Sequence, residues 1–319
     1  MRVAVVDIGT NSTRLLIADV PDDGTTRLTQ LLRRTTVTRL GQGVDATGAL
    51  APEAMQRVYA ALDAYKNDID DNNVTATTAV LTSAVRDARN GAEFTQTVRD
   101  TYNLDARTIT GDEEAQLTFL GATSERPPND DPLAVFDVGG GSTELVVGHD
   151  GTVDFHVSTQ AGVVRQTERF LHHDPPATEE LQALRTEART IFTTAVPQKT
   201  RQSVTAALAV AGTATSAAAL LQELEPYDPV RVHGFRLLAA QCEMLLARLA
   251  AMDNAERARQ PGLHPDRAPA IVAGLILLIE AMRAFDLDEV EVSEHDILRG
   301  AALDLARRSE GSRGGTGEG

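Results

Sequence analysis

Apolar and polar positions repeat one pattern twice along this chain of 319 residues. Residues 4–17 read AVVDIGTNSTRLLI, and residues 134–147 read AVFDVGGGSTELVV. Each copy is an apolar run, an aspartate, a turn with glycine and hydroxyl groups, and a second apolar run. Apolar runs separated by such a turn are typical of a β-hairpin, so the repeat predicts two similar halves that each begin with a hairpin.

The rest of the first half alternates between strand and helix patterns. Short apolar runs bounded by turn residues indicate strands, and apolar residues three and four positions apart indicate amphipathic helices. After hairpin strands at 2–8 and 13–20 we expect strands at 26–37, 74–81 and 106–109, and helices at 52–69, 93–102 and 111–123.

The second half repeats this order after a Pro- and Asp-rich linker at 126–132. The pattern predicts an α/β protein with one domain at 1–125, a second at 133–308 and a hinged cleft, as gene duplication would produce. The Gly/Ser-rich segment 309–319 is expected to be disordered. After the second hairpin at 133–148 we expect strands at 152–159, 208–211 and 289–292, and helices at 161–172, 177–195, 236–252, 266–284 and 296–308.

Charge and composition narrow the range of partners. A net charge of −16 argues against non-specific binding to nucleic acid. The longest apolar run, 270–279, is far too short to span a membrane. No secretory leader precedes the first strand, and the single cysteine, Cys242, fits a reduced compartment. We therefore expect a cytoplasmic protein with neither a nucleic-acid nor a membrane partner.

The two hairpin turns are candidate phosphate sites. Glycine allows a tight turn whose N–H groups converge on one oxygen atom. Asp7 and Asp137 end the strands before the turns, where carboxylates could hold Mg²⁺, or Mn²⁺ in its place. An ordinary turn with a local aspartate hydrogen bond is the alternative, but two copies in one frame favour phosphate and metal. The candidate phosphate contacts are Gly9, Thr10, Asn11, Ser12, Gly139, Gly140, Gly141 and Ser142.

Two further strand ends carry candidate phosphate contacts. Arg86, in TSAVRDA, could clamp a phosphate, or it could pair with Asp87 at the start of a helix. Gly212 and Thr213 follow a buried strand and could approach a third phosphate or a nucleotide, or they could form a plain strand-to-helix turn. The local sequence leaves both alternatives open.

The remaining candidates are glutamates. Glu113 and Glu114 lie in the first turn of a predicted helix, where the helix dipole favours acidic residues. Neighbouring helical positions point about 100° apart, so only one of the two could face a cleft. Glu144 occupies the position that Arg14 holds in the first copy, which suggests that the second copy carries more of the metal or water chemistry.

Seven ordered segments resemble the exopolyphosphatase/guanosine pentaphosphate phosphatase (Ppx/GppA) family. They are DIGTNSTRLLIADV, TSAVRDA, GDEEAQLTFLGA, FDVGGGSTELVVG, VAGTATS, PGLHPDRAPAIVAG and VSEHDILRG. Because that family shares the fold of actin, sugar kinases and Hsp70, the resemblance implies a duplicated actin-like fold of two domains with an interdomain cleft. It also allows the last helix, 296–308, to belong to the first domain.

The resemblance further implies Mg²⁺-dependent release of terminal orthophosphate from inorganic polyphosphate, with guanosine pentaphosphate (pppGpp) 5′-phosphohydrolase as the alternative. Longer members add an HD-like C-terminal domain that this chain lacks, so we expect a preference for short polyphosphate. A homodimer is expected. A sugar or acetate-type kinase and a non-catalytic polyphosphate- or alarmone-binding regulator are more remote alternatives.

Carried over residue by residue, the resemblance makes Glu114 the catalytic base. Asp137 and Glu144 match the acids that organise metal and water, and with Asp7 they form the expected metal set. The matching substrate contacts are Asn11, Arg86, residues 139–142, Gly212 and Thr213.

Overall fold

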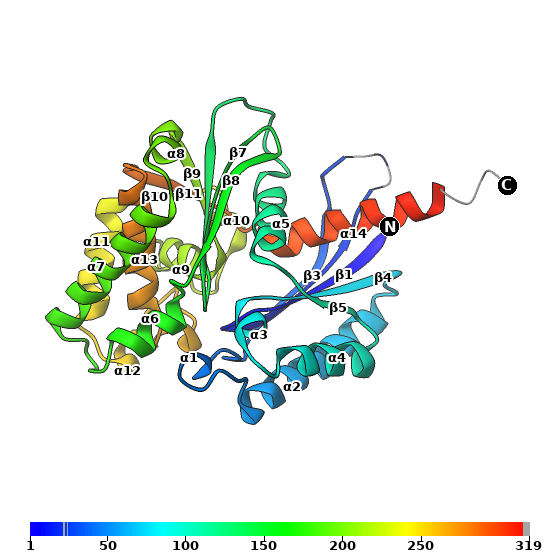
Figure 1. Ribbon diagram of the computed structural model, residues 1–319, viewed down its shortest axis with the longest axis horizontal. Coiled ribbons are helices and arrows are strands. Elements are labelled where there is room, and N and C mark those ends of the chain that lie inside the picture. The colour runs from blue at the N-terminus through cyan, green and yellow to red at the C-terminus, as the bar shows by residue number, and fades with distance from the viewer. Residues whose placement is uncertain (22, 24, 315–319) are drawn as a thin grey trace. The chain divides into compact units, whose positions relative to one another are not determined.

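The computed structural model describes residues 1–21, 23 and 25–314 and forms two compact units (Figure 1). The first unit comprises Met1–Pro127 together with the chain from His295 onward, and the second comprises Pro128–Glu294. The chain thus changes units within the linker 126–132 and returns to the first unit for its last helix.

The first unit is built on a five-stranded mixed sheet in the order β3-β2-β1-β4-β5. The first three strands form an antiparallel meander, and β4 and β5 continue the sheet in parallel with β1. The central strand β1 is buried along almost its whole length because helices cover both faces of the sheet. The strands are β1 Arg2–Ile8, β2 Ser12–Asp19, β3 Thr29–Val37, β4 Ala76–Leu81 and β5 Asp105–Thr108.

Alternate residues of β1 pack into two different apolar clusters. Ala4, Val6 and Ile8 face the cluster that includes α2 and α4, whereas Val3 and Val5 face the cluster that includes the last helix, α14. This two-residue alternation is what a strand between two helical layers requires. The helices are α1 Val44–Thr47, α2 Pro52–Asp71, α3 Ser83–Asp87, α4 Gly91–Tyr102, α5 Gly111–Thr123 and α14 Ile297–Gly314.

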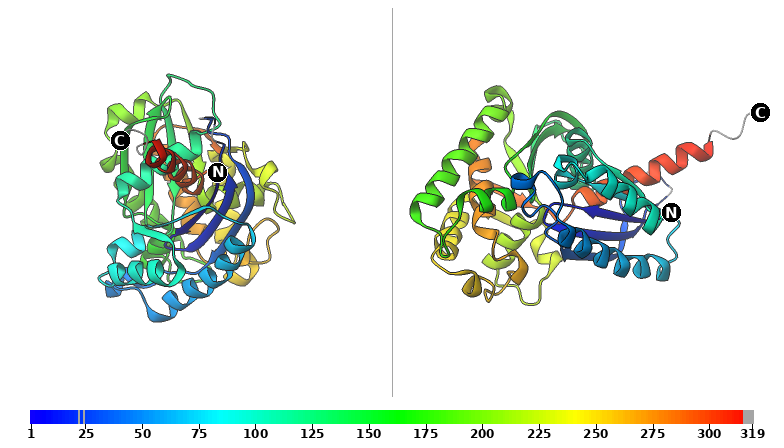
Figure 2. Two further views of the ribbon diagram at one scale, coloured as in Figure 1. Left: turned by 90° about the vertical axis from the view of Figure 1, so that its right-hand side faces the viewer. Right: turned by 60° about the horizontal axis from the view of Figure 1, so that its bottom comes forward.

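The last helix, α14, packs on α5 and β1 of the first unit (Figure 2). It continues to Gly314, so the prediction that residues 309–314 are disordered is wrong. The Ser309 Oγ donates a hydrogen bond to the Leu305 carbonyl, and extending an established helix costs far less than nucleating one. Residues 315–319 of the predicted tail lie outside the described residues.

The second unit carries a six-stranded mixed sheet in the order β10-β11-β9-β6-β7-β8. Its core repeats the first unit, with an antiparallel meander of β6, β7 and β8 and with β9 parallel to β6. The strands are β6 Leu133–Val138, β7 Thr143–His149, β8 Thr152–Thr159, β9 Ala206–Val210, β10 Arg236–Leu238 and β11 Glu289–Val292.

Two helix starts predicted in the second unit are wrong. Residues 236–238 form the edge strand β10, in which only Leu237 is buried, and they pair with β11 before the helix begins at Ala239. Residues 265–267 form a 3-10 turn that begins with proline, so the next helix starts at Ile271. A three-residue strand is too short for its alternation to stand out from a helical pattern.

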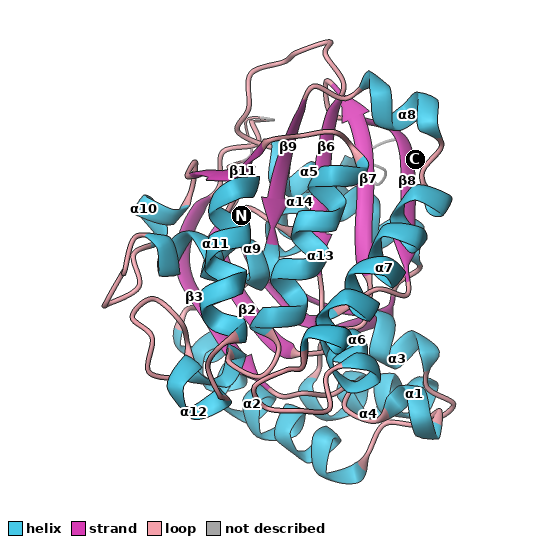
Figure 3. Cartoon of the chain, turned by 90° about the vertical axis from the view of Figure 1, so that its left-hand side faces the viewer, coloured by secondary structure: helices cyan, strands magenta, loops and turns pink. Residues whose placement is uncertain are grey.

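Helices cover one face of the second sheet (Figure 3). The most buried of them is α13, which is apolar on almost every side and packs against α7 and α11. The helices are α6 Val163–Phe170, α7 Thr178–Ala195, α8 Gln198–Ser203, α9 Ala211–Leu221, α10 Pro229–Val232, α11 Ala239–Ala250, α12 Asn254–Arg257 and α13 Ile271–Ala284.

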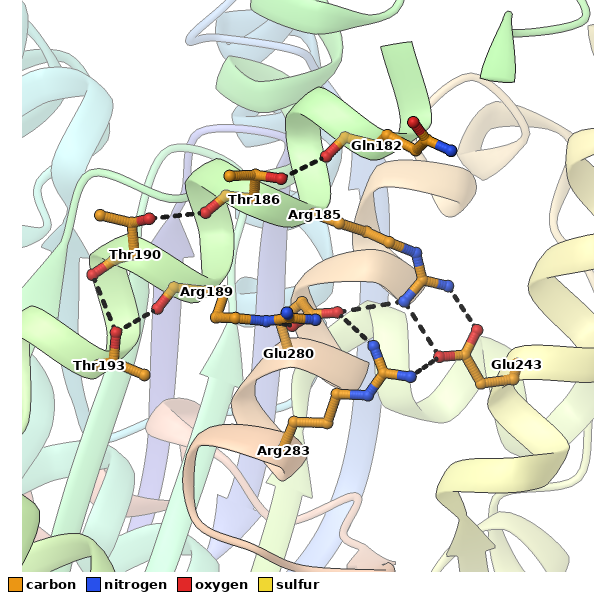
Figure 4. Close-up of polar contacts among 9 residues, drawn as sticks. All are labelled: Gln182, Arg185, Thr186, Arg189, Thr190, Thr193, Glu243, Glu280 and Arg283. Carbon is orange, nitrogen blue, oxygen red and sulfur yellow. Dashed lines mark hydrogen bonds and ion pairs between the residues drawn. The ribbon is translucent and has the colours of Figure 1, made fainter. Parts of the chain in front are cut away.

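One fully buried carboxylate interrupts the apolar surface of α13. Glu280 accepts hydrogen bonds from Arg185 at 3.1 Å, from Arg189 at 3.0 Å and from Arg283 at 2.7 Å (Figure 4). Arg185 and Arg283 also bind Glu243 of α11. This network joins three helices through paired charges.

Among the described residues, no helix combines the length and apolar character needed to cross a membrane.

Candidate active site

The two repeated turns close with the same hydrogen bond. In the first unit the Gly9 amide donates to the Ser12 carbonyl at 3.0 Å, and in the second the Gly139 amide donates to the Ser142 carbonyl at 3.0 Å. A Cβ at either glycine would lie within 3.1 Å of that same serine oxygen. The repeat in sequence is therefore also a repeat in backbone geometry.

Backbone donors hold the carbonyls of the first turn. The Asn11 carbonyl accepts from Thr38 and Arg39 at 3.0 and 2.9 Å, and the Thr10 carbonyl accepts from Gly41 at 2.8 Å. The Thr10 hydroxyl also shares a buried hydrogen bond of 2.9 Å with Ser83, the first residue of α3. Because its carbonyls are engaged inside the unit, the turn presents less negative partial charge to an anionic ligand.

Helix α6 performs the same task in the second unit. Its first amides, of Val163 and Val164, donate to the carbonyls of Gly139 and Gly140 at 2.9 and 2.8 Å. A Cβ at the residue before them, Gly162, would overlap the turn backbone, so glycine is required for this close approach. The start of α6 therefore holds the turn in place, and its first two amides donate to carbonyls of the turn.

Two carboxylates face each other beside the second turn. Asp137 and Glu144 are directly opposite in the pairing of β6 with β7, and 7% and 1% of their surfaces are exposed. The Ser158 hydroxyl donates to Glu144 Oε1 at 2.8 Å. Like charges directly opposite on neighbouring strands repel each other, so this pair is suited to a cationic ligand.

The residues present fit a magnesium ion that arrives with phosphate. Magnesium is commonly held by one or two carboxylates, with substrate phosphates and water as the other ligands. Asp137 and Glu144 supply two such carboxylates, whereas the described residues contain no group of three or more His, Cys, Asp or Glu suited to a metal. Two carboxylates match a site in which substrate phosphate and water complete the coordination of the ion, and not a site in which protein groups supply every ligand.

The first unit places an arginine where the second has Glu144. Asp7 is directly opposite Arg14, whose Nε donates to Asp7 Oδ2 at 2.8 Å. Burial raises the pKa of Asp7, and the Arg14 charge opposes that shift. The other oxygen, Asp7 Oδ1, is buried without a hydrogen-bond partner among the described residues, which leaves it as the available ligand atom of this carboxylate.

The structure separates the two adjacent glutamates of α5. Glu113 accepts the Thr110 amide at 3.0 Å in a capping box, and Arg107 pairs with it at 2.6 Å. The backbone hydrogen bond from Thr110, aided by Arg107, lowers the pKa of Glu113. Glu114 is buried instead, and its Oε2 accepts from Arg86 Nη1 at 3.0 Å. Glu113 therefore stabilises the helix start, and Glu114 is the buried member of the pair that Arg86 holds.

Arg86 lies close to the predicted base. The strand β4 ends at Leu81, and the short helix α3 that follows presents Arg86 beside the start of α5. Its Nη1 also donates to the Ile109 carbonyl at 3.0 Å. Arg86 is therefore not simply an exposed partner of Asp87. It links α3, which follows β4, to the segment that follows β5.

The third predicted loop lies at the start of α9 in the second unit. Ala211 adopts a left-handed φ of 63°, a strained conformation for a residue with a Cβ, and Gly212 and Thr213 follow it. The Arg267 guanidinium packs so closely on Gly212 that a Cβ there would overlap it. Sequence reasoning missed Arg267, although it lies in the segment PGLHPDRAPAIVAG that carried part of the family resemblance.

The predicted site residues thus form two groups, one in each unit. The first unit holds the turn of residues 9–12 with Asp7, and the Arg86–Glu114 pair. The second unit holds the turn of residues 139–142 with Asp137 and Glu144, and the loop with Gly212 and Thr213.

Residues 16–308 match the Ppx/GppA phosphatase family. The chain belongs to this family. Exopolyphosphatase 2 of Mycobacterium tuberculosis is 40% identical over 316 residues, which cover 96% of this chain and 98% of the relative. The prediction that the chain is a hydrolytic enzyme of the Ppx/GppA family is confirmed.

Solved structures of family members share the fold. The Ppx/GppA family member from Aquifex aeolicus has a TM-score of 0.80 and 32% identity, covering 97% of this chain and 98% of that one. An exopolyphosphatase from Cytophaga hutchinsonii has a TM-score of 0.85 and 26% identity, covering 95% and 98%. The predicted α/β fold of two related units is confirmed.

Proposed function

We propose that this Ppx/GppA protein is an exopolyphosphatase, which releases terminal orthophosphate from inorganic polyphosphate. The observation that carries the proposal is the buried carboxylate of Glu114, held by Arg86 at 3.0 Å while its neighbour Glu113 caps the helix. The near full-length similarity to a protein named exopolyphosphatase 2 supports polyphosphate as the substrate.

Glu114 acts on water in this proposal. A buried carboxylate fixed by one arginine nitrogen has a defined direction, and it can orient a water molecule and accept its proton as the water attacks phosphorus. A positioned general base of this kind contributes about 10²- to 10⁴-fold in rate. Attack by water releases orthophosphate without a covalent enzyme intermediate.

Backbone amides and arginine bind the phosphate chain. Catalysis of phosphoryl transfer depends on positioning and on donors aimed at the phosphoryl oxygens. The two turns closed by Gly9 and Gly139 supply backbone donors, and Arg86 adds a guanidinium next to the base. The start of α9, at Gly212 and Thr213, is the proposed third phosphate contact.

Asp137 and Glu144 would hold Mg²⁺, and Asp7 Oδ1 is the candidate atom in the first unit. A bound Mg²⁺ would neutralise charge on the phosphate oxygens. Ser158 fixes one oxygen of Glu144, so this carboxylate would meet the ion in a set direction. Activity should therefore be lost with a chelator and restored by Mg²⁺.

The test is orthophosphate release from short-chain polyphosphate, long-chain polyphosphate and pppGpp, assayed in parallel. Glu114→Gln should lower kcat by about 10²-fold or more. Glu113→Gln is the matched control, because glutamine also completes a capping box and the variant should keep wild-type kcat.

The substrate pattern decides the assignment. Release from polyphosphate with little from pppGpp supports the proposal, and faster release from short chains supports the expected chain-length preference. Release mainly from pppGpp would replace it with an alarmone phosphohydrolase. A folded Glu114→Gln protein with wild-type turnover would remove Glu114 from the mechanism.

A further inference from the structure

A buried carboxylate at the start of the last helix reaches the first turn through Arg14. Asp296 immediately precedes α14, and its Oδ1 accepts the Leu298 amide at 3.1 Å, as a helix cap does. Its Oδ2 accepts from Arg14 Nη1, and from Arg33 Nη2 at 2.9 Å. Asp296 is therefore both a cap and an anchor for two guanidinium groups.

Arg14 bridges two carboxylates with different parts of one guanidinium. Its Nε and Nη2 donate to Asp7 Oδ2, and its Nη1 donates to Asp296 Oδ2. The side chains of Asp7 and Asp296 are 3% and 2% exposed, and that of Arg14 is 14% exposed. The planar Arg14 guanidinium is hydrogen-bonded at both edges and cannot rotate. Because it binds Asp7 Oδ2, it also fixes the direction of Asp7 Oδ1.

Asp296 is also tied to the helix that carries the base. A Cβ at Gly121 of α5 would overlap the Asp296 carbonyl, and a Cβ at Gly300 of α14 would overlap the Leu117 carbonyl. The backbones of α5 and α14 are therefore in direct contact, and Glu114 lies in the first turn of α5. Asp296 thus contacts α5 through its backbone carbonyl and Arg14 through its carboxylate.

We propose that Asp296 is a positioning residue for phosphate release, acting through Arg14 to hold Asp7 at the first turn. The inference rests on the proposed function. The second unit has no arginine at the position of Arg14, because Glu144 stands there and binds Ser158. The residue before the last helix thus holds Arg14, and Arg14 in turn holds Asp7 beside the first turn.

The test exploits the two roles of Asp296. Asp296→Asn removes the charge that anchors Arg14 but retains an oxygen for the Leu298 amide, since asparagine caps helices as well as aspartate does. Asp253 caps α12 by accepting the Glu256 amide at 2.8 Å, so Asp253→Asn makes the same exchange away from the site and should leave kcat unchanged. Thermal unfolding of both variants verifies that they fold.

The decisive measurement is a double-mutant cycle on kcat with Arg14→Gln. Asp296→Asn should lower kcat about tenfold with KM within about twofold, as loss of a supporting contact does. In the Arg14→Gln background the same exchange should change kcat by less than about twofold, because Arg14 transmits its effect.

Two outcomes would overturn the inference. If Asp296→Asn lowers kcat by the same factor with and without Arg14, or leaves kcat at the wild-type value, then Asp296 has only a structural role while the proposed function stands. If the wild type releases no phosphate from polyphosphate or pppGpp, the proposed function fails and the inference fails with it.

Discussion

Arg86 Nη1 lies 3.0 Å from Glu114 Oε2, so the residue expected to clamp phosphate holds the residue expected to activate water. The two come from different helices, α3 after β4 and α5 after β5, and the parallel pairing of these strands brings them together. One nitrogen of Arg86 is shared between Glu114 and the Ile109 carbonyl. The guanidinium is thus fixed before any ligand binds.

Removal of Arg86 should reduce both binding and turnover. Arg86→Gln deletes a charged donor beside the base, and kcat/KM should fall by about 10²-fold. Arg86→Lys keeps the charge but not the planar fork, and it should recover only part of this loss. Arg107→Gln, which breaks the pair with the capping Glu113, is the control and should keep wild-type kcat/KM. Equal effects of Arg86→Gln and Arg107→Gln in steady-state assays would contradict the assigned role.

Neutralising Glu144 should stabilise the fold while it lowers activity. Glu144→Gln relieves the repulsion with the directly opposite Asp137, so the free energy of unfolding should rise by about 0.5 kcal/mol. Phosphate release should fall about 10- to 100-fold, because a carboxylate that organises the metal is lost. Urea unfolding and the phosphate assay measure the two effects on one sample. A variant that is both less stable and fully active would show that the pair is a purely structural contact.

Glu280 should be far more important for stability than its partner Glu243. Glu280→Gln leaves three arginines around a fully buried site, and breaking a buried ion pair costs about 3–5 kcal/mol. Glu243 has a side chain that is 32% exposed, so Glu243→Gln should cost much less. Comparison of urea midpoints tests this order. Equal midpoints for the two variants would mean that water solvates the site around Glu280.

Glu180 should contribute to acid sensitivity. The hydrogen bond from His173, together with the amides of Ala177 and His172, lowers the pKa of Glu180 from 4.5 to about 2. A carboxyl with a lowered folded-state pKa stabilises the protein above its unfolded pKa, and this contribution is lost as the pH falls from 4.5 towards 2.

Glu180→Gln should therefore narrow the difference in melting temperature between about pH 6 and about pH 3. Glu179→Gln, at the neighbouring exposed position of α7, is the matched control. If both variants show the same change in melting temperature between these two pH values as the wild type, the hydrogen bonds to Glu180 do not favour its ionised form.

Local chemistry made much of the site predictable from the chain alone. In both copies an aspartate, a glycine and a serine follow in the same order between two apolar runs. Each copy forms a hairpin whose turn is closed by a glycine-to-serine backbone hydrogen bond, because the two residues are only three positions apart. The local sequence left the choice between Glu113 and Glu114 open, and the family resemblance pointed to Glu114. The structure adds that Thr110, three residues before Glu113, forms a capping box with it. The burial of Glu114 beside Arg86, 28 residues away in sequence, is instead a result of tertiary packing.

Long-range pairing decided the rest. Asp296 is 282 residues from Arg14 in sequence, and nothing near either residue indicates that they meet. The edge strand β10, the contact of Arg267 with Gly212 and the packing of α14 on the first unit likewise depend on which surfaces fold together. The sequence by itself determined the repeated turns and their closing hydrogen bonds, because those contacts are local. Only the tertiary structure decided which distant charges hold them, because burial and ion pairing depend on the whole fold.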